Sequence, residues 1–133
     1  MYTRVTKTSN RKINGQSNFI KSAGFAIQGI KEFFKSERNG KIQAVIAVIV
    51  FLAGLLFSIS MMEWLVIILF TALVISLEMF NSALEKLCDK VNPEMDPQIK
   101  VIKDMAAGAV LWTSILSIVA GICIFIPKII KLL

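Results

Sequence analysis

Apolar residues are gathered into three long stretches, each of which can cross a bilayer as an α-helix. A helix needs roughly 20 apolar residues to span the hydrocarbon core. The pattern predicts spans over about residues 42–62, 64–85 and 105–126, and we expect Asp104 to cap the start of the third. The predicted fold class is therefore an all-α integral membrane protein with three transmembrane helices.

A further helix is predicted directly upstream of the first span, over residues 19–38. Its apolar side chains recur at steps of three to four residues, and its polar positions are mostly basic. The apolar set is Phe19, Ala23, Ile27, Ile30 and Phe34, and the polar set is Lys21, Gln28, Lys31, Lys35 and Arg38. Such a helix is expected to lie on an anionic membrane surface. A soluble helix packed on another protein is the alternative.

Residues 1–18 are polar and basic, without the apolar core and cleavage site of a secretory signal. They are expected to form a disordered cytoplasmic tail, and residues 19–133 a single membrane domain. The turn residues of segment 92–97 mark the one clear connector.

Composition supports a membrane protein and argues against a nucleic-acid partner. Of the 133 residues, 56% are hydrophobic, more than the core of a soluble domain this small needs. The net charge is +6, but nine of the fifteen Lys and Arg precede Ile42, and basic residues beside an apolar span indicate orientation. The link 86–103 carries four Lys and the link 60–63 none, so the N-terminus and link 86–103 are expected to be cytoplasmic.

The chain contains no His, so acid–base and metal chemistry must use carboxylates or Lys. Cys88 and Cys123 have no metal-site or redox spacing and are expected to be unpaired. No phosphate-binding loop and no Gly-rich kinase loop is present.

One face of the second span carries the candidate chemistry. Glu78, Asn81, Glu85 and Asp89 are offset by zero, three, seven and eleven residues, which aligns them on a helix. An acid near the end of an apolar span is expensive unless it is paired, wet or metal-bound. Mg²⁺ prefers such oxygen ligands together with substrate phosphates. The alternative is an ordinary amphipathic helix whose acids are solvated, above all Asp89.

Lys103 lies at the entry to the third span and could hold nucleotide phosphates as a point charge. The alternative is a Lys that extends to the membrane surface without a chemical role. Helical periodicity alone therefore predicts no more than a protein with three spans and a row of acidic residues that could bind a metal ion.

Two sequence runs resemble the signature of the prokaryotic diacylglycerol kinase family. They are Glu78-x-x-Asn81-Ser82-Ala83-Leu84-Glu85-x-x-x-Asp89 and Lys103-Asp104-Met105-Ala106-Ala107-Gly108-Ala109-Val110. The resemblance extends from about Phe19 onward and implies a homotrimer in the bacterial inner membrane. It also implies composite active sites at the cytoplasmic membrane surface, which transfer the γ-phosphate of MgATP to a lipid hydroxyl.

The resemblance also implies roles for individual residues. Glu78 matches the general base and Asn81 its positioning partner. Glu85 matches a ligand of Mg²⁺ in the nucleotide site, to which Lys103 and Asp104 also belong.

The family has a second metal-binding Glu on the surface helix, which also serves the nucleotide site, and Glu32 is the match proposed for it. The spacing between Glu32 and Glu37 is one residue shorter than the best-known family pattern, and one residue turns a side chain by about 100°. Glu37 is therefore a further candidate. Ser82 and Asp89 are possible supporting residues.

Three functions follow from the sequence. The leading hypothesis is a diacylglycerol kinase that makes phosphatidic acid. Undecaprenol kinase is the nearest competitor, because the segments Ser36-Glu37-Arg38-Asn39 and Ala106-Ala107-Gly108-Ala109 resemble that branch at least as well. A non-enzymatic scaffold or transporter subunit is the alternative of another class, in which the polar stripe would serve helix association.

Overall fold

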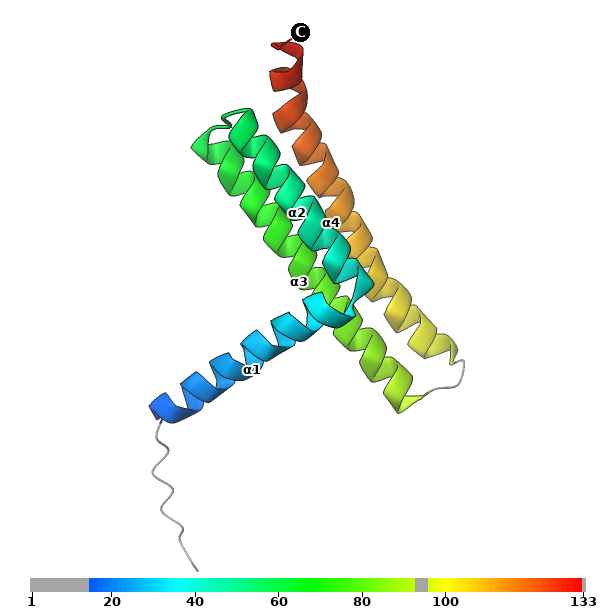
Figure 1. The fold of residues 1–133 in the computed structure, drawn as a ribbon. Coiled ribbons are helices and arrows are strands. Elements are labelled where there is room, and N and C mark those ends of the chain that lie inside the picture. The colour runs from blue at the N-terminus through cyan, green and yellow to red at the C-terminus, as the bar shows by residue number, and fades with distance from the viewer. Residues whose placement is uncertain (1–14, 93–95, 133) are drawn as a thin grey trace, which may run out of the picture.

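Four α-helices make up the part of the chain that the computed structural model describes, residues 15–92 and 96–132. They are α1 (Gly15–Ser36), α2 (Arg38–Leu56), α3 (Met61–Val91) and α4 (Pro97–Ile130). The last three lie side by side as a bundle, and α1 projects from it at a steep angle (Figure 1). Each of the three is long and apolar enough to cross a membrane. The prediction of an all-α membrane protein with three spans is therefore confirmed.

The first span ends earlier, and the second begins earlier, than the apolar pattern predicted. We expected the first span to reach residue 62, but α2 ends at Leu56 and α3 begins at Met61. The reason is a capping box at the start of α3. The Ser60 hydroxyl accepts a hydrogen bond from the Glu63 N–H at 3.3 Å, and the Glu63 carboxylate accepts one from the Ser60 N–H at 2.7 Å.

The third span begins earlier than expected, and the prediction that Asp104 caps it is wrong. Asp96 is the cap, because its carboxylate accepts hydrogen bonds from the N–H groups of Gln98 and Ile99 at 2.7 and 3.3 Å. Pro97 follows in the first turn, where its missing N–H costs nothing. The predicted connector does separate α3 from α4, and its residues 93–95 lie outside the described part of the chain.

The amphipathic helix is present as α1, shifted toward the N-terminus. It begins at Gly15, so residues 15–18 of the expected tail are helical, and residues 1–14 lie outside the described range. It ends at Ser36 because Glu37 has an extended backbone, with φ −86° and ψ 126°. Most large apolar side chains of α1 are exposed in the monomer, including Phe19 and Phe25, which suits a helix that contacts lipid.

The corner between α1 and α2 is closely packed. Phe33 is buried, and its ring lies against the backbone of Gly40 in the first turn of α2. A Cβ atom at Gly40 would lie 2.9 Å from Cε1 of Phe33. Glycine at this position therefore lets α1 turn sharply away from α2, with Asn39 directed by the corner toward the bundle.

At the far end of the bundle, a small apolar core and one ion pair join the helices. Ile59, Ile67 and Ile124 are buried together, with Trp64 and Phe125 packed against them. The Lys128 ammonium lies 3.0 Å from the Glu63 carboxylate and links the end of α4 to the start of α3. Elsewhere most large apolar side chains are exposed, as expected of helices that face lipid.

The contact between α2 and α3 gives a prediction about stability. A Cβ atom at Gly54 would lie 2.7 Å from Cη2 of Trp64, a ring that is itself packed against the core. We expect Gly54→Ala to lower the free energy of unfolding by about 1–3 kcal/mol through overpacking. Thermal unfolding of the purified protein in micelles measures the change. Gly24→Ala is the control, because a Cβ atom there meets nothing within 4 Å, and an unchanged Gly54→Ala midpoint would contradict the packing.

Candidate active site

The polar stripe of α3 is buried near the corner between α1 and α2 and becomes exposed at its other end, at Asp89. Glu78 is only 4% exposed and Asn81 7%, and Glu85 is half-buried one turn further on. At 1.5 Å per residue, Glu78 lies about 25 Å along the axis from the start of α3 and Glu85 about 36 Å. Because the hydrocarbon core is about 30 Å thick, the stripe crosses the expected membrane boundary. The end of α3 projects beyond the level of α1 (Figure 1).

Glu78 is bound by a side chain from another helix. The Asn39 amide at the start of α2 donates a hydrogen bond from Nδ2 to Oε1 of Glu78. A buried carboxylate is costly without such a partner, so this contact explains how the fold tolerates Glu78 at this depth. The sequence analysis did not place Asn39 in the site. The sequence shows only that Asn39 follows the predicted surface helix. Its contact with Glu78 depends on how α1 and α2 meet, which the sequence pattern does not give.

Asn81 lies one turn from Glu78 and is bonded in the opposite direction. Its Nδ2 donates to Oε1 of Glu85 at 3.1 Å. Its Oδ1 is buried and accepts no hydrogen bond from the described residues. A buried carbonyl oxygen without a donor is uncommon in native proteins and calls for an explanation such as a bound ion or water. Asn81 and Glu85 are thus joined by a hydrogen bond, and each also carries an oxygen atom of the kind that binds hard cations.

Lys103 reaches across from α4 to the same region. Its ammonium lies 2.8 Å from Oδ1 of Asp89 and within electrostatic range of Glu85. The structure therefore pairs the predicted nucleotide lysine with Asp89, on the same helix face as the predicted metal ligand Glu85. Asp104 differs, because its carboxylate pairs with Lys100 on its own helix. Ser82 is half-buried beside Asn81 on α3.

Of the two acids proposed on the surface helix, the structure ties Glu37 to α3 directly. Its carboxylate lies 2.6 Å from the ammonium of Lys86, the neighbour of Glu85. Glu32 is exposed one turn earlier, and it is within electrostatic range of the same lysine without a direct ion pair. Glu37 is therefore joined to α3 by a direct ion pair, whereas Glu32, which sequence matching put first, is not. Lys86 was not identified from the sequence.

The site offers few protein ligands for a divalent cation. Within residues 15–92 and 96–132, no three acidic or Cys side chains gather closely enough to enclose a metal ion. Mg²⁺ in nucleotide sites commonly uses one or two carboxylates, with phosphate and water oxygens for the rest. The Glu85 carboxylate and the unpaired Oδ1 of Asn81 fit this incomplete protein shell. The residues therefore suit a cation that arrives with a nucleotide.

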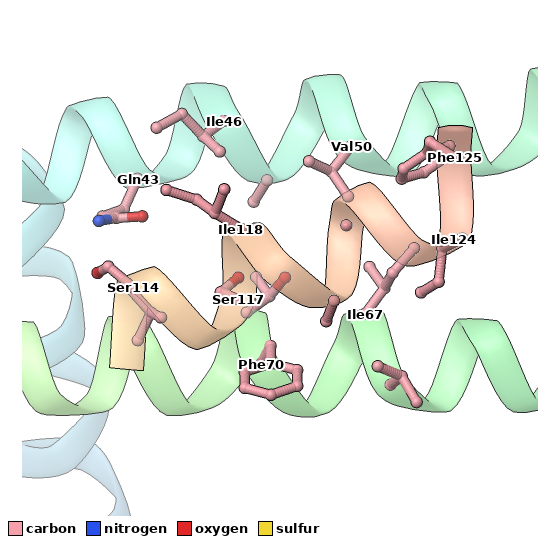
Figure 2. A pocket seen from close by; sticks show the side chains of 16 residues that line it. Gln43, Ile46, Val50, Ile67, Phe70, Ser114, Ser117, Ile118, Ile124 and Phe125 are labelled. Carbon is pink, nitrogen blue, oxygen red and sulfur yellow. The ribbon is translucent and has the colours of Figure 1, made fainter. Parts of the chain in front are cut away.

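A pocket of about 260 Å³ lies between α2, α3 and α4 on the membrane side of the stripe. Its walls are mostly apolar, and Figure 2 shows Gln43 of α2 facing Ser114 of α4 at one end, with Phe125 at the other. Gln43 lies one turn beyond Asn39, and the lining residue Val74 lies one turn before Glu78. The polar end of the pocket is therefore the end nearest the buried carboxylate.

The family is settled by comparison with known proteins. A sequence model described as prokaryotic diacylglycerol kinase matches residues 24–125. The chain belongs to the prokaryotic diacylglycerol kinase family. It is 37% identical over 115 residues to the undecaprenol kinase of Bacillus subtilis, covering 86% of this chain and 94% of that protein. It is also 32% identical over 117 residues to a diacylglycerol kinase of Synechocystis, covering 87% and 67% of the two chains.

A diacylglycerol kinase of Haemophilus influenzae is 28% identical over 99 residues, which cover 74% of this chain and 84% of that protein. The resemblance found in the sequence is thus confirmed, and the chain is an enzyme of a lipid kinase family. A non-enzymatic scaffold or transporter subunit is not favoured. The family match covers α2, α3 and most of α1 and α4, so it includes every residue of the stripe.

Proposed function

We propose that this protein transfers the γ-phosphate of MgATP to the hydroxyl of a membrane lipid alcohol. The observation that carries the proposal is Glu78, a carboxylate that is almost fully buried yet lies at the expected depth of a lipid headgroup. A buried acid at this position is costly for the fold, and a role as general base accounts for it. The kinase names of the relatives support the same reaction class.

The reaction needs little covalent help from the protein. The lipid hydroxyl oxygen forms a bond to the γ-phosphorus while the bond from that phosphorus to the bridging oxygen of ADP breaks. Glu78 accepts the hydroxyl proton as the new bond forms. Mg²⁺, when bound with ATP, neutralises charge on the phosphates. The Glu85 carboxylate and Oδ1 of Asn81 would hold the ion, and Lys103 would contact the phosphates in place of Asp89.

The pocket between α2, α3 and α4 suits the hydrocarbon part of the acceptor. It is mostly apolar, lies between the three membrane-spanning helices and ends one turn from Asn39 and Glu78. A chain lying there would bring its terminal hydroxyl toward the buried carboxylate, which is the positioning that phosphoryl transfer requires. The same arrangement would exclude water from the attacking oxygen.

For the acceptor, we put undecaprenol ahead of diacylglycerol, reversing the order that the sequence suggested. The support is the similarity to the Bacillus undecaprenol kinase, which is higher and covers nearly that whole protein. The test offers each lipid in mixed micelles with radiolabelled ATP and Mg²⁺ to the purified protein. Phosphate transfer to undecaprenol at the higher kcat/KM supports the assignment, and preference for diacylglycerol reverses it. Transfer to neither lipid, with both present in the micelles, would contradict the kinase proposal.

The protein is further proposed to act as a homotrimer in the bacterial inner membrane, with its N-terminus and active site on the cytoplasmic side. The basic residues of link 86–103 and of α1 support this orientation. In a Cys88→Ala, Cys123→Ala background, a cysteine at Ser58 should react with an impermeant thiol reagent outside intact cells. A cysteine at Gln98 should react only after lysis, and the opposite pattern would invert the topology.

A further inference from the structure

Asn39 donates a hydrogen bond to the proposed base, and its place at the start of α2 is fixed from two sides. It lies in the first turn of α2, directly before Gly40, whose backbone packs against the Phe33 ring. Two residues earlier, Glu37 is paired with Lys86 at 2.6 Å. The corner is thus joined to α3 both by an ion pair and by the Asn39–Glu78 hydrogen bond. The backbone that carries Asn39 is therefore held at this corner, and its exposed side chain is directed to α3 by the hydrogen bond to Glu78.

The hydrogen bond also distinguishes the two oxygens of Glu78. Oε1 accepts from Asn39, and among the described residues no donor is bonded to Oε2. A fixed donor on Oε1 sets the plane of the carboxylate and leaves Oε2 to accept a proton from a substrate. A general base must lie within about 2.6–3.2 Å of the atom it deprotonates, so the orientation of this plane affects the rate directly.

Asn81 does not supply this contact. Family resemblance implies that Asn81 positions the base, but its Nδ2 donates to Glu85, and no hydrogen bond joins Asn81 to Glu78 in the described part of the chain. The two Asn residues therefore bind different carboxylates of the stripe. Asn39 donates to Glu78, the proposed base, and Asn81 donates to Glu85, the proposed cation ligand.

We propose that Asn39 is a positioning residue that acts through Glu78 and orients its carboxylate toward the acceptor hydroxyl. The inference rests on the proposed function, since it needs Glu78 to be the base. On this proposal, the corner between α1 and α2 contributes to the reaction by carrying the residue that orients the base. The proposal also predicts that changes at Asn39 alter kcat more than KM for either substrate.

A double-mutant cycle between Asn39 and Glu78 tests the inference. We expect Asn39→Ala to lower kcat by about 10- to 100-fold, the usual cost of losing a hydrogen bond to a charged group, with both KM values within about twofold. Asn39→Asp, which has the same shape but places a second carboxylate against Glu78, should lower kcat further. In a Glu78→Gln background, Asn39→Ala should change the residual kcat by less than about twofold.

A second variant and a control keep the test decisive. Asn39→Gln retains the amide on a longer stem, and it should recover part of the kcat lost in Asn39→Ala. If Asn39→Ala does not fold, Asn39→Leu, which has nearly the shape of Asn but no donor, replaces it in the cycle. Lys128→Ala removes a polar contact between helices at the far end of the bundle. It should lower the unfolding temperature without a change in kcat, which separates positioning from stability.

Equal losses in the two backgrounds, or an unchanged kcat in Asn39→Ala, would overturn the role of Asn39 while wild-type turnover still supports the kinase. Absence of phosphate transfer by the wild-type protein would instead overturn the proposed function itself. The two failures are thus distinguishable in a single set of assays.

Discussion

Glu78→Gln is expected to lower lipid phosphorylation by on the order of 10²–10⁴-fold, the usual contribution of general-base assistance. The amide is nearly isosteric with the carboxylate, and its oxygen can still accept the hydrogen bond from Asn39. It cannot take the proton of the acceptor hydroxyl at neutral pH. Fold and nucleotide affinity should therefore survive while kcat falls, and the fall should appear equally in kcat/KM.

A structural role for Glu78 predicts the opposite result. Replacing a buried charge by a neutral amide is then tolerated or even stabilising, because the cost of burial is removed. Glu63→Gln is the matched control. It changes a Glu of the same helix to the same amide at the far end, where Glu63 belongs to a capping box and pairs with Lys128. Its turnover should stay near wild type, and a Glu78→Gln variant equally active would rule out the base.

The spans were predictable because their signal is local. A run of apolar residues long enough to cross a bilayer identifies a helix whatever it packs against. The ends of these helices were less predictable, because apolar content indicates which residues can contact lipid and does not indicate where a helix starts. Two signals that do mark helix starts were present in the sequence and were overlooked. They are the Ser60-x-x-Glu63 capping box and the Asp96-Pro97 pair, a cap followed by proline.

The site was predictable only along one helix. Helical periodicity placed Glu78, Asn81 and Glu85 on one face, and the structure has them so. The contacts of this face with other elements depend on how α1 and α2 meet and how α3 crosses them. No periodicity in the sequence fixes that angle, which here depends on Gly40 packing against Phe33. The Asn39–Glu78 and Glu37–Lys86 contacts therefore required the structure.

A comparably large effect is expected when Glu85, the proposed Mg²⁺ ligand of the stripe, is changed. Glu85→Gln should raise the Mg²⁺ concentration needed for half-maximal activity by at least about tenfold and weaken MgATP binding. The reason is the loss of one anionic oxygen, and even a residue that only orients a ligand is worth about 10–100-fold in metal affinity. The hydrogen bond from Asn81 can persist, because the Gln side chain retains an oxygen acceptor. The local fold should therefore be kept.

The control must remove a negative charge from the same end of the bundle without touching the stripe. Asp96→Asn does so, since Asn caps a helix about as well as Asp. Its Mg²⁺ titration should match the wild type. Glu32→Gln and Glu37→Gln belong in the same series, and the structure predicts the larger shift for Glu37, whose carboxylate lies beside α3. If Glu85→Gln keeps the wild-type Mg²⁺ dependence, Glu85 is not a ligand, and the unpaired oxygen of Asn81 needs another partner.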